Sequence, residues 1–239
     1  MKNIKLIYSI NFDKIARSPK EIIYIILHYT GMTSEKKAIE RLTNKKSKVS
    51  SHYFIKKNGT IINMVPEKFT AWHAGVSCWK SHKNLNNKSI GIEIQNSGHI
   101  NKYENFSIKQ IKSLLLLTKI LKKKYNIKIK NFLGHSDISP NRKKDPGEKF
   151  PWKHLAKHKI GIWYDLPKKK RKFRGIEVSK KNKKLFLQHL KKIGYCLKNK
   201  YTKSTVRAFQ RRFRSKIIDG KIDKECLEIS KNLIKRGLN

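Results

Sequence analysis

Two histidines and one aspartate stand at positions typical of a metal site. His28 ends an apolar run, His135 ends a shorter one, and Asp145 follows ten residues later in the segment HSDISPNRKKDPG. Two imidazoles and one carboxylate are the protein ligands of many zinc hydrolases, in which the fourth position is left to water. Spacing alone is weak support, because a single histidine at a strand end is more often structural than metal-bound. The histidines that could pair instead include His52, His73, His82 and His99.

Rigid elements must position such ligands, because tetrahedral coordination tolerates little error. Apolar runs or alternation predict strands at 21–29, 51–56, 60–65, 89–95 and 130–135. Apolar spacing and polar caps predict helices at 34–43, 107–124 and 150–158. Asn58 and Gly59 supply a hairpin turn between the second and third strands. Strands that alternate with helices indicate an α/β fold with a mixed central β-sheet flanked by helices.

The chain changes character after about residue 176. Apolar residues recur with helical spacing within 180–193, 203–214 and 224–236. The preceding stretch PKKKRKFR is polar and highly charged, as linkers are. We therefore expect a domain large enough to be catalytic at 1–166, with its core at about 20–160. A basic linker at 167–175 and a small all-α domain at 176–239 should follow.

Charge is the strongest anomaly of the composition. Lys and Arg number 58 against 16 Asp and Glu, a formal net charge of +42. This favours anionic partners such as nucleic acid, membrane surface or cell wall. However, the excess is mostly lysine and is spread along the chain, which indicates compositional bias. We find neither a clustered basic stripe nor a nucleic-acid-binding motif, so we expect no specific nucleic-acid partner. Mutual repulsion favours a monomer.

The cysteines and the N-terminus indicate little about the cellular compartment of the protein. Cys78, Cys196 and Cys226 are odd in number and show no CxxC spacing, so we expect no disulfide framework and three small, buried or semi-buried residues. No run approaches the ~18 apolar residues of a membrane span, so no transmembrane segment is expected. The N-terminus contains no readable signal peptide or lipobox-like cysteine, which leaves the export route open.

Five blocks of sequence, in order, resemble the type 2 N-acetylmuramoyl-L-alanine amidases. The blocks are IILHYT, VSSHYFIKKNGTIINMVPE, AWHAG, LNNKSIGIEIQN and GHSDISPNRKKDPGEKFPW. The likeness extends from about residue 20 to 165 and is greatest to the broad-specificity branch. It implies a zinc-dependent hydrolase that cleaves the amide bond between N-acetylmuramic acid and L-alanine in peptidoglycan or muropeptides. It also implies that His28, His135 and Asp145 bind Zn²⁺.

The resemblance assigns catalytic roles to two further residues. Glu93 resembles the family's catalytic glutamate, and Lys143 resembles the basic residue two positions before the aspartate ligand. Zinc would polarise the scissile carbonyl and lower the pKa of bound water. Glu93 would act as general base and then acid, and Lys143 would offset the oxyanion charge. Between Ile92 and Ile94, Glu93 should point away from their face, which suits either a catalytic or an idle carboxylate.

The same blocks suggest how substrate is bound. Trp72 and His73 are expected to line the groove that receives muramyl peptide, and Asn86 to hold a loop near the site. Arg142 is expected to meet a carboxylate of the stem peptide, because Arg pairs with carboxylates in bidentate fashion. His52 is expected to support the fold through hydrogen bonds.

The C-terminal segment resembles a peptidoglycan-binding module of three helices. LFLQHLKKIGY is followed by STVRAFQRRFR, in which Val206, Phe209 and Phe213 would pack. The stretch CLKNKYTKST between the first two helices lacks the glycine that usually precedes the threonine. Wall binding is therefore open, and the alternative is a helical cap that only stabilises the larger domain.

One rival function is a recognition protein that holds peptidoglycan without cutting it. Loss of zinc ligands marks that class, whereas all three ligand positions and Glu93 are present here. The substrate chemistry points to the cell envelope and the missing signal to the cytoplasm, so localisation stays open. The preference for muramic or anhydromuramic substrates, and for a particular stem peptide, is also open.

Overall fold

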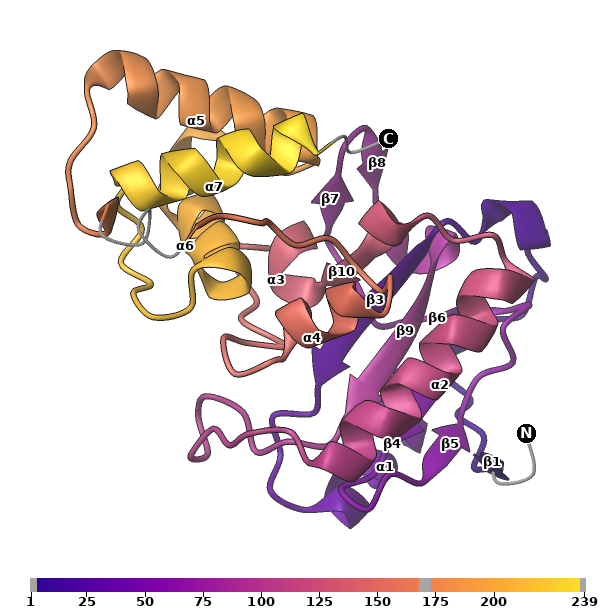
Figure 1. The fold of residues 1–239 in the computed structure, drawn as a ribbon. Coiled ribbons are helices and arrows are strands. Elements are labelled where there is room, and N and C mark those ends of the chain that lie inside the picture. The colour runs from indigo at the N-terminus through magenta and orange to yellow at the C-terminus, as the bar shows by residue number, and fades with distance from the viewer. Residues whose placement is uncertain (1–3, 168–172, 237–239) are drawn as a thin grey trace.

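A mixed β-sheet forms the centre of the molecule (Figure 1). The computed structural model describes residues 4–167 and 173–236, which include a sheet of strand order β1-β5-β4-β9-β3-β10. The strands are β1 (Ile4–Leu6), β5 (Ile61–Asn63), β4 (Tyr53–Ile55), β9 (Ser89–Ile94), β3 (Tyr24–Tyr29) and β10 (Phe132–Gly134). β4, β9, β3 and β10 are parallel to one another, whereas β5 is antiparallel to β4 and parallel to β1.

Helices cover this sheet, which confirms the predicted α/β class. They are α1 (Glu35–Thr43), α2 (Ile108–Lys124), α3 (His135–Ile138) and α4 (Trp152–Lys157). Ser34 and Ser107 cap α1 and α2, each accepting a backbone N–H three residues on. The smaller strand pairs are β2 (Phe12–Asp13) with β6 (Thr70–Ala71), and β7 (Cys78–Trp79) with β8 (His82–Lys83). No helix within the described ranges has the length and hydrophobicity to cross a membrane.

Alternation along β3 places its apolar side chains in two different core clusters, one on each face of the sheet. Ile25 and Leu27 pack with α2 on one face, while Tyr24 and Ile26 pack on the other. By the same alternation His28 follows Ile26 onto the second face. Its register partner on β9 is Glu93, whose neighbours along β9 pack with α2. His28 and Glu93 therefore share one face at the carboxyl ends of adjacent parallel strands, as the alternation in the sequence predicts for Glu93.

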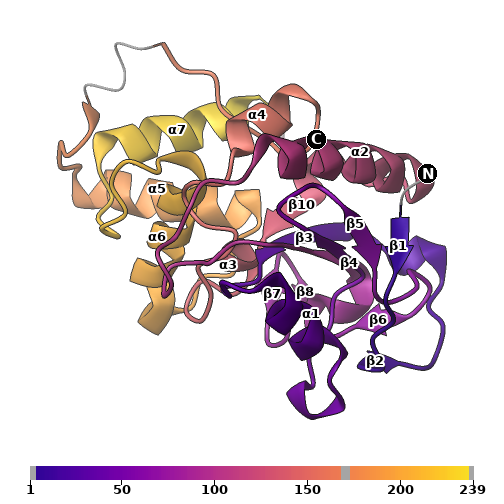
Figure 2. The same ribbon diagram turned by 90° about the horizontal axis from the view of Figure 1, so that it is seen from below.

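The C-terminal helices pack against part of the second face, beside β3 and β10. These are α5 (Lys180–Ile193), α6 (Thr202–Phe213) and α7 (Lys224–Lys235), close to the expected helical segments. They gather beside β10 and α3 in both views (Figures 1 and 2). Phe209 and Phe213 of α6 belong to the same apolar core as Ile26 and Leu133 of the sheet. The two regions are thus packed through a common core; of the expected linker 167–175, residues 168–172 lie outside the described part.

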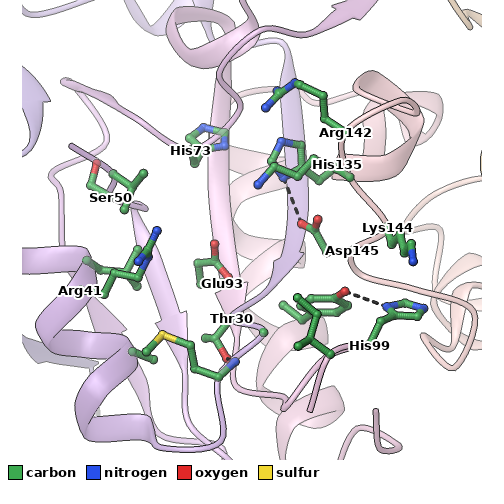
Figure 3. A pocket seen from close by; sticks show the side chains of 18 of the residues that line it. Thr30, Arg41, Ser50, His73, Glu93, His99, His135, Arg142, Lys144 and Asp145 are labelled. Carbon is green, nitrogen blue, oxygen red and sulfur yellow. Dashed lines mark hydrogen bonds and ion pairs between the residues drawn. The ribbon is translucent and has the colours of Figure 1, made fainter. Parts of the chain in front are cut away.

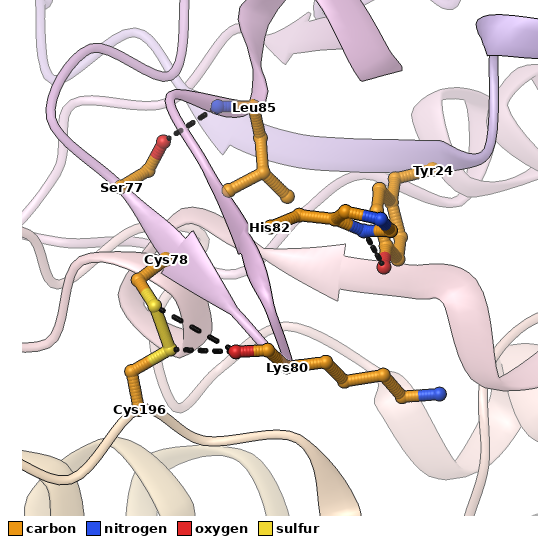
Figure 4. Close-up of a disulfide and its surroundings, with 7 residues drawn as sticks. All are labelled: Tyr24, Ser77, Cys78, Lys80, His82, Leu85 and Cys196. Carbon is orange, nitrogen blue, oxygen red and sulfur yellow. Dashed lines mark hydrogen bonds between the residues drawn. A yellow bond between two sulfur atoms is a disulfide. The ribbon is translucent and has the colours of Figure 1, made fainter.

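One expectation is wrong: two of the cysteines form a disulfide. Cys78 in β7 is bonded to Cys196 (Figure 4), with their Cα atoms 5.9 Å apart. Cys226 is buried and free. The two bonded residues are 118 positions apart in sequence. No local spacing signals such a pair, because only the packing of α5 and its following loop against the β7–β8 hairpin brings them together. The disulfide therefore joins residues 176–239 to the first part of the chain.

Candidate active site

The three predicted metal ligands meet at the carboxyl edge of the sheet. His28 ends near the tip of β3, His135 begins α3, and Asp145 lies in the following loop; all three are buried. The Nδ1 atoms of His28 and His135 are 2.9 Å apart, and Asp145 Oδ2 is 3.1 and 3.0 Å from them. Two ring nitrogens at that distance need a proton or a cation between them. Two imidazole nitrogens and a carboxylate oxygen form a donor set that suits zinc.

Hydrogen bonds behind each ring leave both Nδ1 atoms facing the cluster. His135 Nε2 donates to the carbonyl oxygen of Ala74 at 3.1 Å. His28 Nε2 lies 3.0 Å from His73 Nδ1, and His73 Nε2 lies 3.2 Å from Ser89 Oγ. A consistent assignment has His28 donating to His73 and His73 donating to Ser89. Such partners fix the tautomer and the orientation of a metal-binding imidazole.

The protonation states also suit metal binding. Burial, and then the neighbouring His135, lower the pKa of His28 to about 4. Burial acts to raise the pKa of Asp145, but the two imidazoles outweigh it and hold that pKa well below its usual range. At neutral pH the cluster therefore has a neutral His28 and an ionised Asp145, the forms in which these groups ligate metals.

Glu93 lies beside the cluster and has an unusual environment. Burial, reinforced by the charge of Asp145, raises the pKa of Glu93 to about 8. Its Oε2 atom is buried, and among the described residues it has no hydrogen-bond partner. A buried unpaired oxygen is rare in folded proteins and is commonly connected with function. A carboxyl group of this kind can take up and release a proton near neutral pH.

The cluster opens into a cavity of about 590 Å³ (Figure 3). Its cationic lining residues are Arg41, Arg142, Lys143 and Lys144. Among the described residues, its acidic lining consists of Glu93 and Asp145. Arg41 extends from α1 on the side opposite Lys144, so that positive groups flank the cavity (Figure 3). The excess of cations favours a ligand with carboxylates.

The residues predicted to bind substrate have different positions. Trp72 and His73 lie on the cavity wall. Asn86 supports that wall from behind, since its Oδ1 accepts the N–H groups of His73 and Ala74 at 3.1 and 2.7 Å. A Cβ atom on Gly91 would lie 2.4 Å from His73 Cγ, so a glycine is needed for the ring to lie against β9.

Arg142, Lys143 and His52 can be placed as well. Arg142 and Lys143 line the cavity, and Arg142 Nη2 donates to the carbonyl oxygen of Val76 at 2.7 Å. His52 lies in the interior, where its Nδ1 accepts the Gly91 N–H at 3.0 Å and its Nε2 donates to a carbonyl oxygen. These bonds match the supporting role expected of His52.

Two residues near the site, Arg41 and Asp137, were not predicted from the sequence. Arg41 lies in a helix that reads as a polar surface segment, yet it neighbours the buried Leu42 and is three residues from the buried Ala38. That periodicity was the signal in the sequence that Arg41 lies at the edge of the buried face of α1, where it can reach the cavity. Asp137 lies two residues after His135 and is 1% exposed, but its side-chain partners Tyr195 and Arg212 come from the C-terminal region. No sequence pattern predicts contacts between residues so far apart in the chain.

Comparison with known proteins agrees with this geometry. Residues 18–148 match the family described as N-acetylmuramoyl-L-alanine amidase. AmiD of Escherichia coli (strain K12) is 34% identical over 229 residues, which cover 89% of this chain and 82% of AmiD. The 1,6-anhydro-N-acetylmuramyl-L-alanine amidase AmpD of Haemophilus influenzae is 32% identical, over 64% of this chain and 90% of AmpD.

Solved structures extend the likeness to nearly the whole chain. AmiD from E. coli, in complex with the substrate anhydro-N-acetylmuramic acid-L-Ala-D-gamma-Glu-L-Lys, has a TM-score of 0.80 and 32% identity, over 94% of this chain and 92% of that one. AMPDH3 from Pseudomonas aeruginosa, in complex with anhydromuramic pentapeptide, has a TM-score of 0.80 and 32% identity, over 96% and 98% of the two chains. The chain therefore belongs to the N-acetylmuramoyl-L-alanine amidases, hydrolases of peptidoglycan catabolism that cleave the amide bond between N-acetylmuramic acid and L-alanine.

Proposed function

We propose that this amidase is zinc-dependent and that His28, His135 and Asp145 hold the ion. The observation that supports this most directly is the approach of two Nδ1 atoms and one carboxylate oxygen to about 3 Å of one another in a buried cluster. When bound there, zinc would polarise the scissile carbonyl and lower the pKa of water. The oriented imidazoles and the ionised Asp145 supply the ligand forms that this requires.

Glu93 is the proposed general base and acid. It accepts a proton from the attacking water at a carboxylate oxygen and delivers it to the nitrogen of the departing L-alanine. Its position on β9 beside His28 supports this role, and so does its Oε2 atom, which has no hydrogen-bond partner in the described part of the chain. The raised pKa suits the second step, because a carboxyl group that holds a proton near neutrality can still deliver it.

Lys143 is the proposed oxyanion stabiliser. It lines the cavity two residues before Asp145, and its charge acts on both Glu93 and His28. A preorganised cation next to the developing negative charge lowers the barrier, because it needs no reorganisation during the reaction.

The proposed substrate is an anionic muropeptide. The ligand of the similar AmiD structure contains a γ-linked D-Glu and a terminal L-Lys. A γ-linked glutamate retains a free α-carboxylate, and the terminal residue of a peptide retains another. We assign Arg41 and Arg142 to such carboxylates, with Trp72 and His73 against the sugar and first amino acid. Arg41 and Arg142 reach the cavity from different sides (Figure 3), which suits a ligand with two separated anionic groups.

Residues 176–239 are proposed to be a three-helix domain that resembles peptidoglycan-binding modules. Val206, Phe209 and Phe213 are buried, as such a module requires. The alternative, a cap that stabilises the amidase region, is favoured by the core that these helices share with the sheet. Retention of the chain on purified sacculi, compared with the same chain lacking the surface lysines of α5, would separate the two.

Hydrolysis of a purified anhydromuramyl tripeptide is the direct test. We expect release of the free tripeptide by the zinc-loaded chain, and none after chelation or in the variants Glu93→Ala and His135→Ala. If a folded, zinc-loaded chain released no peptide, the proposed mechanism would be wrong, and a role in holding peptidoglycan would replace it.

A further inference from the structure

Asp137 is a buried carboxylate immediately behind the proposed metal site. It lies in α3, the short helix whose first residue is His135, and its side chain is 1% exposed. Asp137 Oδ2 accepts the N–H of Gly134 at 2.8 Å, which ties the end of β10 to α3. Asp137 therefore sets how the chain turns from the strand into the helix that presents the ligand.

The other donors to Asp137 come from the C-terminal helical region. Tyr195 donates its hydroxyl to Asp137 Oδ1 at 2.7 Å, and Arg212 donates Nη1 to Asp137 Oδ2 at 2.5 Å. Both donors are buried, and so is the acceptor. A buried carboxylate is tolerated only when charged or hydrogen-bonding partners satisfy it. The turn that begins with His135 thus depends on side chains contributed from residues 176–239.

Arg212 contacts the amidase region at further points. Its Nη2 donates to the carbonyl oxygen of Phe132 in β10 at 3.1 Å. Its guanidinium lies 4.0 Å from the centre of the Trp152 ring in α4. One planar, rigid group therefore joins β10, α3 and α4. A lysine could replace the charge at this position, but it could not reproduce the forked hydrogen bonds.

Tyr195 is itself held firmly. It forms an antiparallel bridge with Trp79 in β7, and the two rings are 4.8 Å apart. The next residue is Cys196, which is disulfide-bonded to Cys78 (Figure 4). Ala74 lies in the loop just before the β7–β8 hairpin, and its carbonyl oxygen accepts a hydrogen bond from His135 Nε2. His135 is therefore held on two sides by groups that belong to one cross-linked unit.

We propose that Tyr195 and Arg212 are positioning residues for His135, acting through Asp137, so that residues 176–239 complete the metal site independently of any binding to cell wall. The inference rests on the proposed zinc dependence. Metal coordination tolerates little displacement of a ligand, and partners outside the coordination shell commonly affect metal affinity or activity about 10–100-fold. Loss of either donor would free the start of α3 to shift, and His135 with it.

The test compares full-length variants with a matched control. Tyr195→Phe removes one hydroxyl, Arg212→Gln removes the charge, and Arg212→Lys restores the charge alone. Arg214→Gln is the control, because Arg214 is equally buried but pairs with Asp223 inside the C-terminal region, at 3.3 Å. Zinc affinity by competition with a chromogenic chelator, kcat, KM and Tm are measured for each variant.

We expect Tyr195→Phe and Arg212→Gln to weaken zinc binding about 10–100-fold and to lower kcat far more than they raise KM. Arg212→Lys should recover part of the affinity, whereas Arg214→Gln should lower Tm alone. Unchanged zinc affinity and kcat in Tyr195→Phe would overturn the proposal, and this variant decides if Arg212→Gln fails to fold. Failure of the unmodified chain to bind zinc would instead overturn the proposed function itself, and this inference with it.

Discussion

Glu93 and His28 are register partners on the adjacent parallel strands β9 and β3. Because paired residues of parallel strands project to the same face, a proposed metal ligand and a proposed general base lie side by side on rigid elements. The backbone pairing fixes their separation before any metal or substrate arrives. Chemistry at this edge therefore depends on strand register more than on loop conformation.

Replacing Glu93 by Gln should abolish most of the activity without disturbing the site. Gln has nearly the same shape but cannot accept the water proton, so we expect kcat to fall about 10²–10⁴-fold. Zinc content and KM should stay near those of the unmodified chain. Steady-state kinetics with elemental analysis provides the check. A Glu93→Gln chain that loses its zinc would show that Glu93 acts as a ligand or a support, contrary to the assigned role.

Removal of the metal should abolish the activity and lower the stability of the fold. Chelation would remove the ion proposed to join His28, His135 and Asp145, whose facing atoms lie about 3 Å apart. We expect activity to vanish, Tm to fall, and both to return with Zn²⁺ but not with Mg²⁺, which prefers oxygen ligands. Differential scanning fluorimetry and the peptide-release assay measure this. Full activity after exhaustive dialysis against chelator, verified as metal-free, would exclude zinc dependence.

The sequence predicted the parts of the molecule that depend on local pattern. Strand alternation placed Glu93 on the face away from Ile92 and Ile94, and polar caps indicated the starts of α1 and α2. The resemblance supplied the identity of the proposed ligands, which spacing left ambiguous among nine histidines. The short edge strand β1 was not predicted, because its three residues lack a period long enough to recognise.

Contacts between distant segments were not predictable from the sequence alone. The Cys78–Cys196 disulfide and the Arg212–Asp137 pair join residues that are 118 and 75 positions apart. Their partners are specified by how the C-terminal helices dock on the sheet, not by any spacing along the chain. The odd number of cysteines argued against a disulfide framework. One disulfide together with one free cysteine, as found here, also makes three cysteines.

Arg41→Gln should weaken substrate binding selectively. Arg41 is exposed at the cavity wall, so its pairing with a stem carboxylate would be screened by solvent; we expect KM to rise about 2–5-fold with kcat little changed. The increase should shrink at high salt. Lys36→Gln is the matched control, because Lys36 is exposed on the same helix but does not line the cavity. Equal KM values for the two variants would remove Arg41 from the binding site.

Loss of the disulfide should destabilise the chain. The bridge closes a long loop, for which chain entropy predicts up to about 4–5 kcal/mol of stabilisation. We expect the double variant Cys78→Ser, Cys196→Ser to unfold at lower urea concentration than the unmodified, oxidised chain. Alkylation and mass measurement of the starting protein establish the bond itself. Two free thiols at these positions in protein purified under oxidising conditions would contradict the pairing.

Acid should destabilise the fold partly through His52. Burial, and then the cation of Arg17, lower the pKa of His52 from the usual 6.5 to about 3. The folded chain thus keeps His52 neutral while the unfolded chain takes up a proton below about pH 6.5, so stability falls as pH drops from 6.5 toward 3. Each pH unit in that window removes up to about 1.4 kcal/mol from the free energy of unfolding.

Urea unfolding over this pH range compares His52→Gln with the control His158→Gln, which replaces an exposed histidine. We expect His52→Gln to be the less stable of the two at pH 7. Its free energy of unfolding should fall less steeply with decreasing pH than that of His158→Gln. Because the other titrating groups and metal release are common to both chains, parallel pH profiles for the two variants would mean that His52 is not a source of the acid sensitivity.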